Sequence, residues 1–201
     1  MFSRRNFLAS AAALTALPAA AQEMNDWPLA TLPDELAPRV VKLNMPLPAG
    51  QIHVVPDSYS LYWTLPDSRA IRYFVGVGKD ALYPPGIYTI RAKKVWPSWT
   101  PTDEMIERDP AAYEKYADGM EGGPDNPLGA RALYLFQDGR DTFLRIHGTN
   151  LPNTIGKDVS NGCARLINRQ IVDLYDRVPM DTVVYMYEKD ILPPLGETPA
   201  A

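Results

Sequence analysis

Apolar and polar residues alternate with a period of two along several short segments of the chain, and this pattern predicts β-strands. Four such segments in the first half are separated by Pro, Asp and Gly: residues 52–55, 59–65, 71–77 and 87–92. In the third segment Ile71, Tyr73 and Val75 fall on one face and Arg72 falls on the other. This is the pattern of an antiparallel sheet that is buried on one side.

The alternation returns in the second half of the chain. It covers three further segments: residues 132–136, 142–147 and 182–187. The first two are joined through Asp138 and Gly139, a pair that favours a tight hairpin. Apolar residues in 171–178 recur at helical spacing, and Asn168 is the predicted N-cap of that helix. The sequence therefore predicts a mainly β domain with a few short helices.

Residues 96–129 break this rhythm with repeated prolines and contain one predicted helical turn at 111–116. The segment is long for a connection within one domain. Insertions of this kind are often lids or binding loops, and on length alone plain decoration stays open. Trp96 and Trp99 either flank a substrate groove or form a small core of the insertion itself.

The N-terminus has the features of an export signal. Arg4 and Arg5 directly precede an apolar, Ala-rich stretch at 7–17, as in twin-arginine signals, and three alanines at 19–21 offer a cleavage site. The apolar stretch is too short to span about 30 Å of hydrocarbon, which argues against a retained anchor. We expect residues 1–21 to be removed and the mature protein to reside in the periplasm.

Composition divides the rest of the chain into three parts. Residues 22–50 contain many prolines and are predicted to be an extended leader, 51–190 form the folded domain, and 191–201 are a flexible tail. Loss of the two signal arginines changes the formal net charge from −4 to −6, which argues against nucleic acid as a partner. No apolar run after the signal approaches the length of a membrane span.

Cys163 is the single cysteine of the chain, although exported proteins usually pair their cysteines or avoid them. A lone thiol is either a small buried apolar residue or a reactive group. His147 ends a predicted strand sixteen residues earlier. An imidazole near a thiol accepts its proton, so that the thiolate attacks a carbonyl, and later protonates the leaving amine. The sequence thus predicts a Cys/His pair for acyl transfer.

Residues near the thiol fit the same chemistry. Gly162 allows a turn that points the N–H groups of Gly162 and Cys163 toward an oxyanion, although an ordinary glycine turn stays open. Arg165 either holds a substrate carboxylate, braces the loop or has no special task. His53 is interpreted as structural. The scattered His and Cys residues lack metal-ligand spacing, so we expect no metal and no other cofactor.

The residues around His147 and Cys163 resemble the L,D-transpeptidase catalytic domain, also called the YkuD-type domain. Its signature is His-Gly-Thr and, after a loop, Ser-x-Gly-Cys-x-Arg, which occur here at 147–149 and 160–165. Flanking stretches are also similar to the family: residues 75–79, 85–90 and 126–131. The resemblance covers roughly 51–187 and implies a YkuD-type, β-sandwich-like fold with a long lid-like insertion.

The resemblance implies an enzyme that acts on the stem peptides of peptidoglycan. Cys163 would attack the carbonyl before the terminal D-Ala of a tetrapeptide stem, at the L-centre of the diamino acid, and form a thioester, with His147 as base and acid. The acceptor would be a second stem, giving a 3→3 crosslink, or the terminal lysine of an outer-membrane lipoprotein. Hydrolysis of the same linkages stays open. A non-catalytic peptidoglycan-binding protein with an inert Cys163 is the other alternative.

The resemblance also implies further site residues. Ser160, Gly162 and Gly148 would shape the oxyanion site. The predicted substrate contacts are Arg165, Asn161, Thr149, Asn150, Asn126 and Trp99. Two positions depart from the family pattern: Asn161 stands where many members carry His, and Pro85 varies a turn often written Pro-Thr-Gly. Neither departure removes the Cys/His pair.

Overall fold

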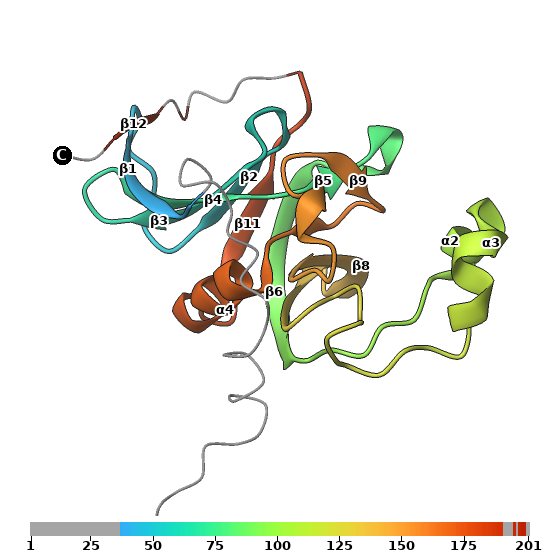
Figure 1. Ribbon diagram of the computed structural model, residues 1–201. Helices are drawn as coiled ribbons and strands as arrows, with labels where there is room; N and C mark the ends of the chain where they lie inside the picture. The colour runs from blue at the N-terminus through green and yellow to red at the C-terminus, as the bar shows by residue number, and fades with distance from the viewer. Residues whose placement is uncertain (1–36, 191–194, 196, 200–201) are drawn as a thin grey trace, which may run out of the picture. The chain divides into compact units, whose positions relative to one another are not determined.

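The alternating segments pair into one large sheet in the computed structural model, which describes residues 37–190, 195 and 197–199 (Figure 1). Ten strands of these described residues form the sheet, in the order β10 (Ala164–Arg165), β8 (Arg140–His147), β7 (Arg131–Gln137), β6 (Gly86–Val95), β11 (Val183–Met186), β2 (Ile52–Val55), β3 (Ser60–Leu65), β4 (Arg69–Phe74), β1 (Arg39–Leu43) and β12 (Glu197–Pro199). A separate pair joins β5 (Val77–Gly78) to β9 (Asp158–Ser160). The predicted mainly β fold is confirmed.

Most neighbouring strands run antiparallel, as the sequence predicts. Two pairs of the main sheet are parallel instead: β11 lies beside β2, and β10 lies beside β8. Strand polarity depends on where the chain returns to the sheet, which local alternation does not reveal. The β10–β8 pair places Arg165 opposite His147.

Both ends of the described chain add strands to the sheet. Within the predicted leader, Arg39–Leu43 form β1 and pair with β4. Within the predicted flexible tail, Glu197–Pro199 form β12 and pair with β1. The predicted signal at 1–21 lies outside the described residues.

The sheet is covered on both faces around β3 and β4, so the predicted one-sided burial is wrong. Arg72, expected to face solvent, is only 6% exposed, and its guanidinium lies 4.5 Å from the centroid of the Phe74 ring. One face contributes to the main core, which includes Ile52, Leu61, Tyr73, Ile90, Leu133, Ile146, Ile171 and Leu174. The other face is covered by a smaller cluster of Val41, Leu43, Val55, Tyr62, Ala70 and Leu195.

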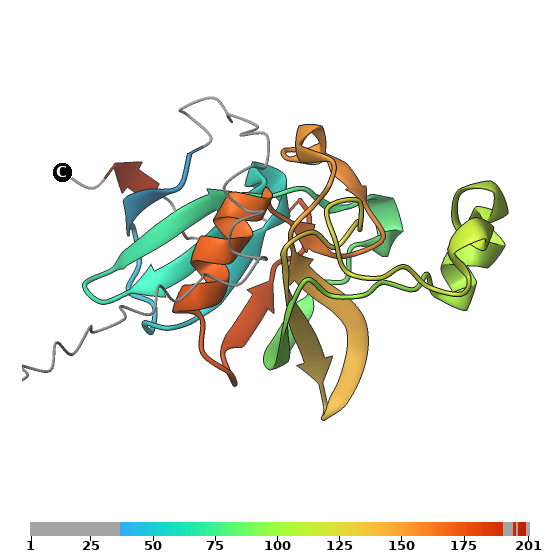
Figure 2. The ribbon, with the colours of Figure 1, turned by 60° about the horizontal axis from the view of Figure 1, so that its bottom comes forward.

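Helix α4 (Asn168–Arg177) lies across one face of the sheet (Figure 2). Its buried Ile171 and Leu174 belong to the main core, and such burial stabilises by roughly 2 kcal/mol for each side chain. The predicted N-cap is wrong by one residue, because Ile167 holds the N-cap position without a side-chain cap. Asn168 instead bonds two loops: its Oδ1 accepts from the Ala130 N–H at 2.8 Å, and its Nδ2 donates to the Thr149 carbonyl.

The insertion contains more helix than its sequence predicts. The predicted turn at 111–116 is present as α3 (Pro110–Tyr113) and the 3-10 turn η4 (Glu114–Tyr116), and α2 (Asp103–Arg108) precedes them. In Figure 1, α2 and α3 stand apart from the sheet, joined to it by two extended segments. The remaining 3-10 turns are η2 (Pro56–Ser58), η3 (Asp80–Leu82) and η5 (Pro152–Thr154). Within the described range, no helix has the length and apolarity needed to cross a bilayer.

Candidate active site

Cys163 follows a tight turn between β9 and β10 that its neighbours hold in place. Gly162 has φ +119°, and a Cβ there would meet the Leu82 carbonyl oxygen at 2.8 Å, so the turn requires glycine. The Ser160 hydroxyl accepts from the Gly162 N–H at 3.2 Å and donates to the Cys163 carbonyl at 2.6 Å. The Gly162 N–H therefore bonds inside the loop, contrary to its predicted oxyanion role, and Ser160 fixes the turn.

Neighbouring backbone holds the two sides of this loop. The Lys79 N–H donates to the Ser160 carbonyl at 3.0 Å. Beyond the thiol, Arg165 and Gly76 exchange two backbone hydrogen bonds, at 2.8 and 2.9 Å. Because bonds on both sides limit its movement, the loop presents Cys163 in one position.

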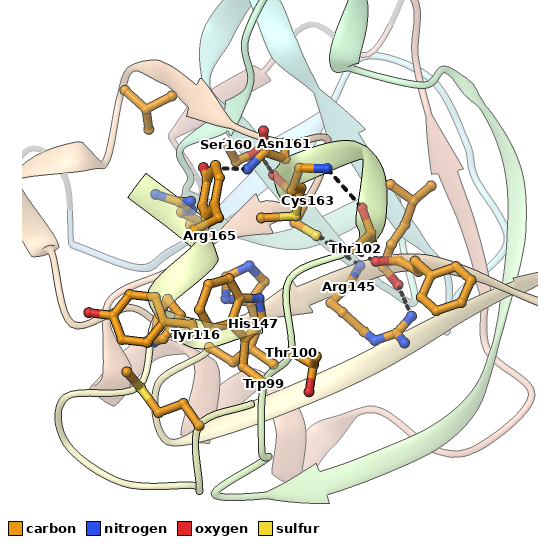
Figure 3. A pocket seen from close by; sticks show the side chains of 18 of the residues that line it. Trp99, Thr100, Thr102, Tyr116, Arg145, His147, Ser160, Asn161, Cys163 and Arg165 are labelled. Atoms are coloured by element: carbon orange, nitrogen blue, oxygen red, sulfur yellow. Dashed lines mark hydrogen bonds between the residues drawn. The ribbon is translucent and has the colours of Figure 1, made fainter. Parts of the chain in front are cut away.

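The pairing of β10 with β8 brings Cys163 and His147 to the same place. In this parallel pair Arg165 lies opposite His147, so Cys163, two residues earlier, lies beside Arg145. The Cys163 Sγ accepts a hydrogen bond from the Arg145 N–H at 3.3 Å. Residues two apart on a strand share a face, so Cys163 and His147 both border one cavity (Figure 3).

His147 is held as a neutral base. Its side chain is buried, and its Nδ1 lies 2.5 Å from the Gly148 carbonyl oxygen. A carbonyl only accepts, so Nδ1 carries the proton and, in the neutral ring, Nε2 does not. Burial, followed by the charge of Arg165, lowers the pKa of His147 to about 3, although the Gly148 carbonyl opposes this.

The thiol is also neutral at rest. Burial raises the pKa of Cys163 above its usual value, against the opposing effects of the Arg145 N–H and then the charges of Arg145 and Arg165. A thiol with a raised pKa and an imidazole with a lowered pKa, which line the same cavity, favour two neutral groups over a resting ion pair.

The sheet and the insertion together enclose a cavity of about 930 Å³ around these residues. The insertion contributes an aromatic wall in which the Trp99 ring lies 5.7 Å from the Tyr116 ring and 6.3 Å from the Tyr113 ring. Both interpretations of Trp99 therefore apply, since it packs within the insertion and also lines the cavity. The volume lies toward the top of the range for small-molecule sites.

Asn161 joins the insertion to the loop that carries Cys163. Its Oδ1 accepts from Arg108 Nη2 at 2.8 Å, and its Nδ2 donates to the Tyr113 hydroxyl at 2.9 Å. Arg108 and Tyr113 were not predicted from the sequence. They belong to the irregular insertion, and no spacing signal relates them to a loop some fifty residues later.

The remaining predicted contacts have mixed outcomes. Asn150 and Arg165 line the cavity. Asn126 is buried, and its amide bonds Met120 O, Glu121 O and the Leu128 N–H, so the structure places it at the folded base of the insertion.

Gly148 and Thr149, which directly follow His147, make contacts that hold the local backbone. The buried Thr149 hydroxyl accepts from the Leu151 N–H at 3.0 Å, so its polar atoms serve the loop rather than a substrate. Gly148 packs so closely on Asn168 that a Cβ would lie 2.2 Å from its Oδ1. The Gly148 carbonyl fixes the His147 tautomer, which is a positioning role.

The structure adds two cavity residues on β8 that the sequence did not predict. Arg145 pairs with Asp141 at 2.6 Å, and its guanidinium lies 3.9 Å from the centroid of the Tyr134 ring. Phe143 has φ +60° at an irregularity in the β7–β8 pairing, and it is 69% exposed at the cavity. The positive φ of a bulky residue next to Cys163 is a strained conformation that alternation cannot reveal.

His53 has the structural environment that the sequence predicts. Its Nδ1 lies 2.9 Å from the Tyr187 hydroxyl, its ring stacks on Tyr185, and burial lowers its pKa to about 4. In the part of the chain that the structure describes, no three His, Cys, Asp or Glu side chains come together as a metal site would need.

A fold with a Cys/His cavity of this kind places the chain in a known class. The family model of the L,D-transpeptidase catalytic domain, YkuD, matches residues 49–186. That match covers more than half of the chain, and the chain belongs to this family.

Individual relatives agree with this assignment. The probable L,D-transpeptidase ErfK/SrfK of Escherichia coli strain K12 is 36% identical over 134 residues, which are 65% of this chain and 42% of that protein. The chain thus spans less than half the length of this curated relative. A mutant of the Enterococcus faecium L,D-transpeptidase covers 70% of this chain and 50% of its own, with a TM-score of 0.52, and at 15% identity it supports the fold alone.

One solved structure has a different description. A Brucella melitensis protein described as a probable carnitine operon oxidoreductase is 46% identical, with a TM-score of 0.53, and the match covers 80% of this chain and 96% of that one. That description belongs to the Brucella protein. Membership of the L,D-transpeptidase family rests on the match over residues 49–186.

Proposed function

We propose that this protein is a cysteine acyltransferase, an L,D-transpeptidase that acts on peptidoglycan stem peptides. One observation carries the proposal: Cys163 and His147 border the same cavity, with the sulfur held by the Arg145 N–H and the imidazole held in the tautomer of a base. A buried thiol without a chemical role would not need a neighbouring base or an open cavity.

The first half of the reaction forms a thioester. His147 Nε2 takes the proton of Cys163 Sγ as the sulfur attacks the carbonyl before the terminal D-Ala of a tetrapeptide stem. The tetrahedral intermediate collapses, the C–N bond breaks, and the amine of D-Ala leaves with the proton from His147. The Cys163 N–H is the proposed oxyanion donor, because the Gly162 N–H bonds to Ser160.

The second half transfers the acyl group. An acceptor amine attacks the thioester, gives its proton to His147, and releases the thiol, to which that proton returns. The acceptor is the diamino acid of a second stem, giving a 3→3 crosslink, or a lysine of a lipoprotein. Water would instead yield a shortened stem. The cavity of about 930 Å³ favours transfer, because it has room for groups of both a donor and an acceptor.

The proposed place of action is the periplasm. It rests on the twin-arginine pattern of residues 1–21 together with the location of peptidoglycan. Fractionation of cells that express the full chain tests this location, and recovery of the protein in the cytoplasm alone would contradict it.

The proposal is tested by mass spectrometry of purified protein incubated with a disaccharide tetrapeptide. We expect release of D-Ala, crosslinked dimers, and a covalent carbapenem adduct on the wild type, with all three lost in Cys163→Ala. Thermal unfolding checks that this variant folds. Unchanged D-Ala release from Cys163→Ala would refute the proposal, and shortened stems without dimers would assign hydrolysis instead. Failure of carbapenem to acylate the folded wild type, with no turnover, would favour a binding protein.

A further inference from the structure

The insertion presents a cation close to the nucleophile. Arg108 is the last residue of α2, it is exposed, and it lines the same cavity as Cys163. Its Nη2 donates to Asn161 Oδ1 at 2.8 Å. Asn161 is two residues before Cys163, and Figure 3 shows the two side by side. The guanidinium is therefore held at the edge of the reaction site.

The partner of this guanidinium is neutral. Among the described residues, no carboxylate lies within 4.0 Å of Arg108, whereas Arg145 is neutralised by Asp141. Glu104, one turn earlier on α2, has its pKa lowered first by its own backbone N–H and the Thr102 hydroxyl, and less by Arg108. Its carboxylate thus serves the start of the helix. A guanidinium has five N–H donors, and Asn161 uses one.

A second guanidinium makes the cavity more positive. Arg165 also lines it, and its buried Nε has no hydrogen-bond partner among the described residues. The carboxylates of Glu104 and Asp125 also line the cavity, but neither forms an ion pair with Arg108 or Arg165 among the described residues. Both guanidinium groups can therefore bind an anion. Arg165 is fixed in the sheet, whereas Arg108 belongs to the insertion, so the insertion adds a separate contact for a longer ligand.

We propose that Arg108 binds a carboxylate of the donor stem peptide beside Cys163, and that Asn161 is the positioning residue that orients it. This inference rests on the proposed function. A tetrapeptide stem offers carboxylates on its terminal D-Ala and on its diamino acid, and a planar guanidinium matches either with two parallel hydrogen bonds. An amide at position 161 orients the cation without neutralising it, which an aspartate would do.

The test uses steady-state kinetics of D-Ala release by the full protein. The substrates are the tetrapeptide with free carboxylates and two versions amidated at either the terminal D-Ala or the diamino acid. We expect Arg108→Gln to raise KM for the free donor about tenfold with little change in kcat. When the donor is amidated at the carboxylate that Arg108 binds, the wild type should already have the raised KM, and Arg108→Gln should not raise KM further.

Three further variants distinguish substrate binding by Arg108 from a purely structural role of its hydrogen bond to Asn161. Arg108→Lys keeps the charge and should restore part of the affinity. Asn161→Asp should raise KM, because the new carboxylate competes with the substrate for Arg108. If Asn161 and Arg108 merely held the insertion in place, the new ion pair would hold it more tightly and KM would not rise. Lys94→Gln, the matched control, removes a charge from an exposed residue of β6 that does not line the cavity, and it should change neither constant. Equal losses on all three donors, or no loss in Arg108→Gln, would overturn the proposal.

A binding measurement keeps this test separate from catalysis. Calorimetry of the free tetrapeptide with Cys163→Ala and with Cys163→Ala plus Arg108→Gln should give a Kd about tenfold higher for the double variant. Absence of turnover by the wild type would refute the proposed function, whereas an equal Kd for the two variants would refute only the role of Arg108.

Discussion

The Ser160 hydroxyl offers the sharpest test of how the thiol is placed. Ser160 is only 1% exposed, and its hydroxyl bonds the Gly162 N–H and the Cys163 carbonyl. Ser160→Ala removes both bonds and leaves two buried backbone groups without this partner. A net contribution of about 1 kcal/mol for each bond predicts a loss of about 2 kcal/mol in the free energy of unfolding.

The same change should reduce kcat by more than the loss in the free energy of unfolding alone would suggest. Without the hydroxyl bridge the turn at Gly162 relaxes, and a shift of the sulfur by about 1 Å costs roughly a hundredfold in rate. We therefore expect kcat for D-Ala release to fall between about tenfold and a hundredfold. Urea denaturation gives the stability, and D-Ala release at saturating donor gives kcat.

Ser60→Ala is the matched control for this variant. Ser60 is equally buried, and its hydroxyl donates to the Ser58 carbonyl at 3.0 Å, away from the cavity. It should lose about 1 kcal/mol of stability and keep its kcat. A Ser160→Ala protein that is destabilised as expected but retains full kcat would show that the hydroxyl stabilises the fold without placing the thiol.

Two further predictions concern charge. Burial lowers the pKa of His147 from 6.5 to about 3, so between these pH values the unfolded chain binds the proton more readily than the folded one. Stability should therefore fall as pH drops below 6.5, and it should fall less in His147→Gln. Chemical denaturation from pH 7 to pH 4 measures this, and equal slopes for the two proteins would contradict it. Lys93 Nζ donates to the Tyr175 and Val178 carbonyls at 2.6 Å at the end of α4. Lys93→Met should therefore lose about 1 to 2 kcal/mol of stability with unchanged kcat. A shift in kcat would contradict a purely structural role.

The resting site combines two neutral groups rather than an ion pair. In the proposed mechanism, the thiolate forms only when a substrate carbonyl occupies the cavity and His147 accepts the proton. The charges of Arg145 and Arg165 would then stabilise the developing thiolate in a buried setting, where electrostatic effects are stronger than in water.

Periodicity by itself determined most of the sheet. The predicted segment 52–55 matches β2, and the segments for β3, β6, β7, β8 and β11 differ only at their ends. Strand side chains alternate between two faces whatever the rest of the fold does, so a strand with distinct faces is visible in sequence. Local motifs also led to the prediction of His147 and Cys163 as a pair, because a histidine at a strand end and a cysteine after a glycine turn are each visible in sequence.

Only the tertiary structure decided which segments that are distant in sequence lie in contact. Arg72 lies opposite Tyr62 in the β3–β4 pair, and Tyr62 belongs to a cluster that includes Leu195, more than a hundred residues away in the chain. The tie between Asn161 and Arg108, and the amide bonds that make Asn126 structural, likewise join segments that no local period connects. Hydrogen bonds and burial depend on distances in space, and the folded chain alone sets those distances.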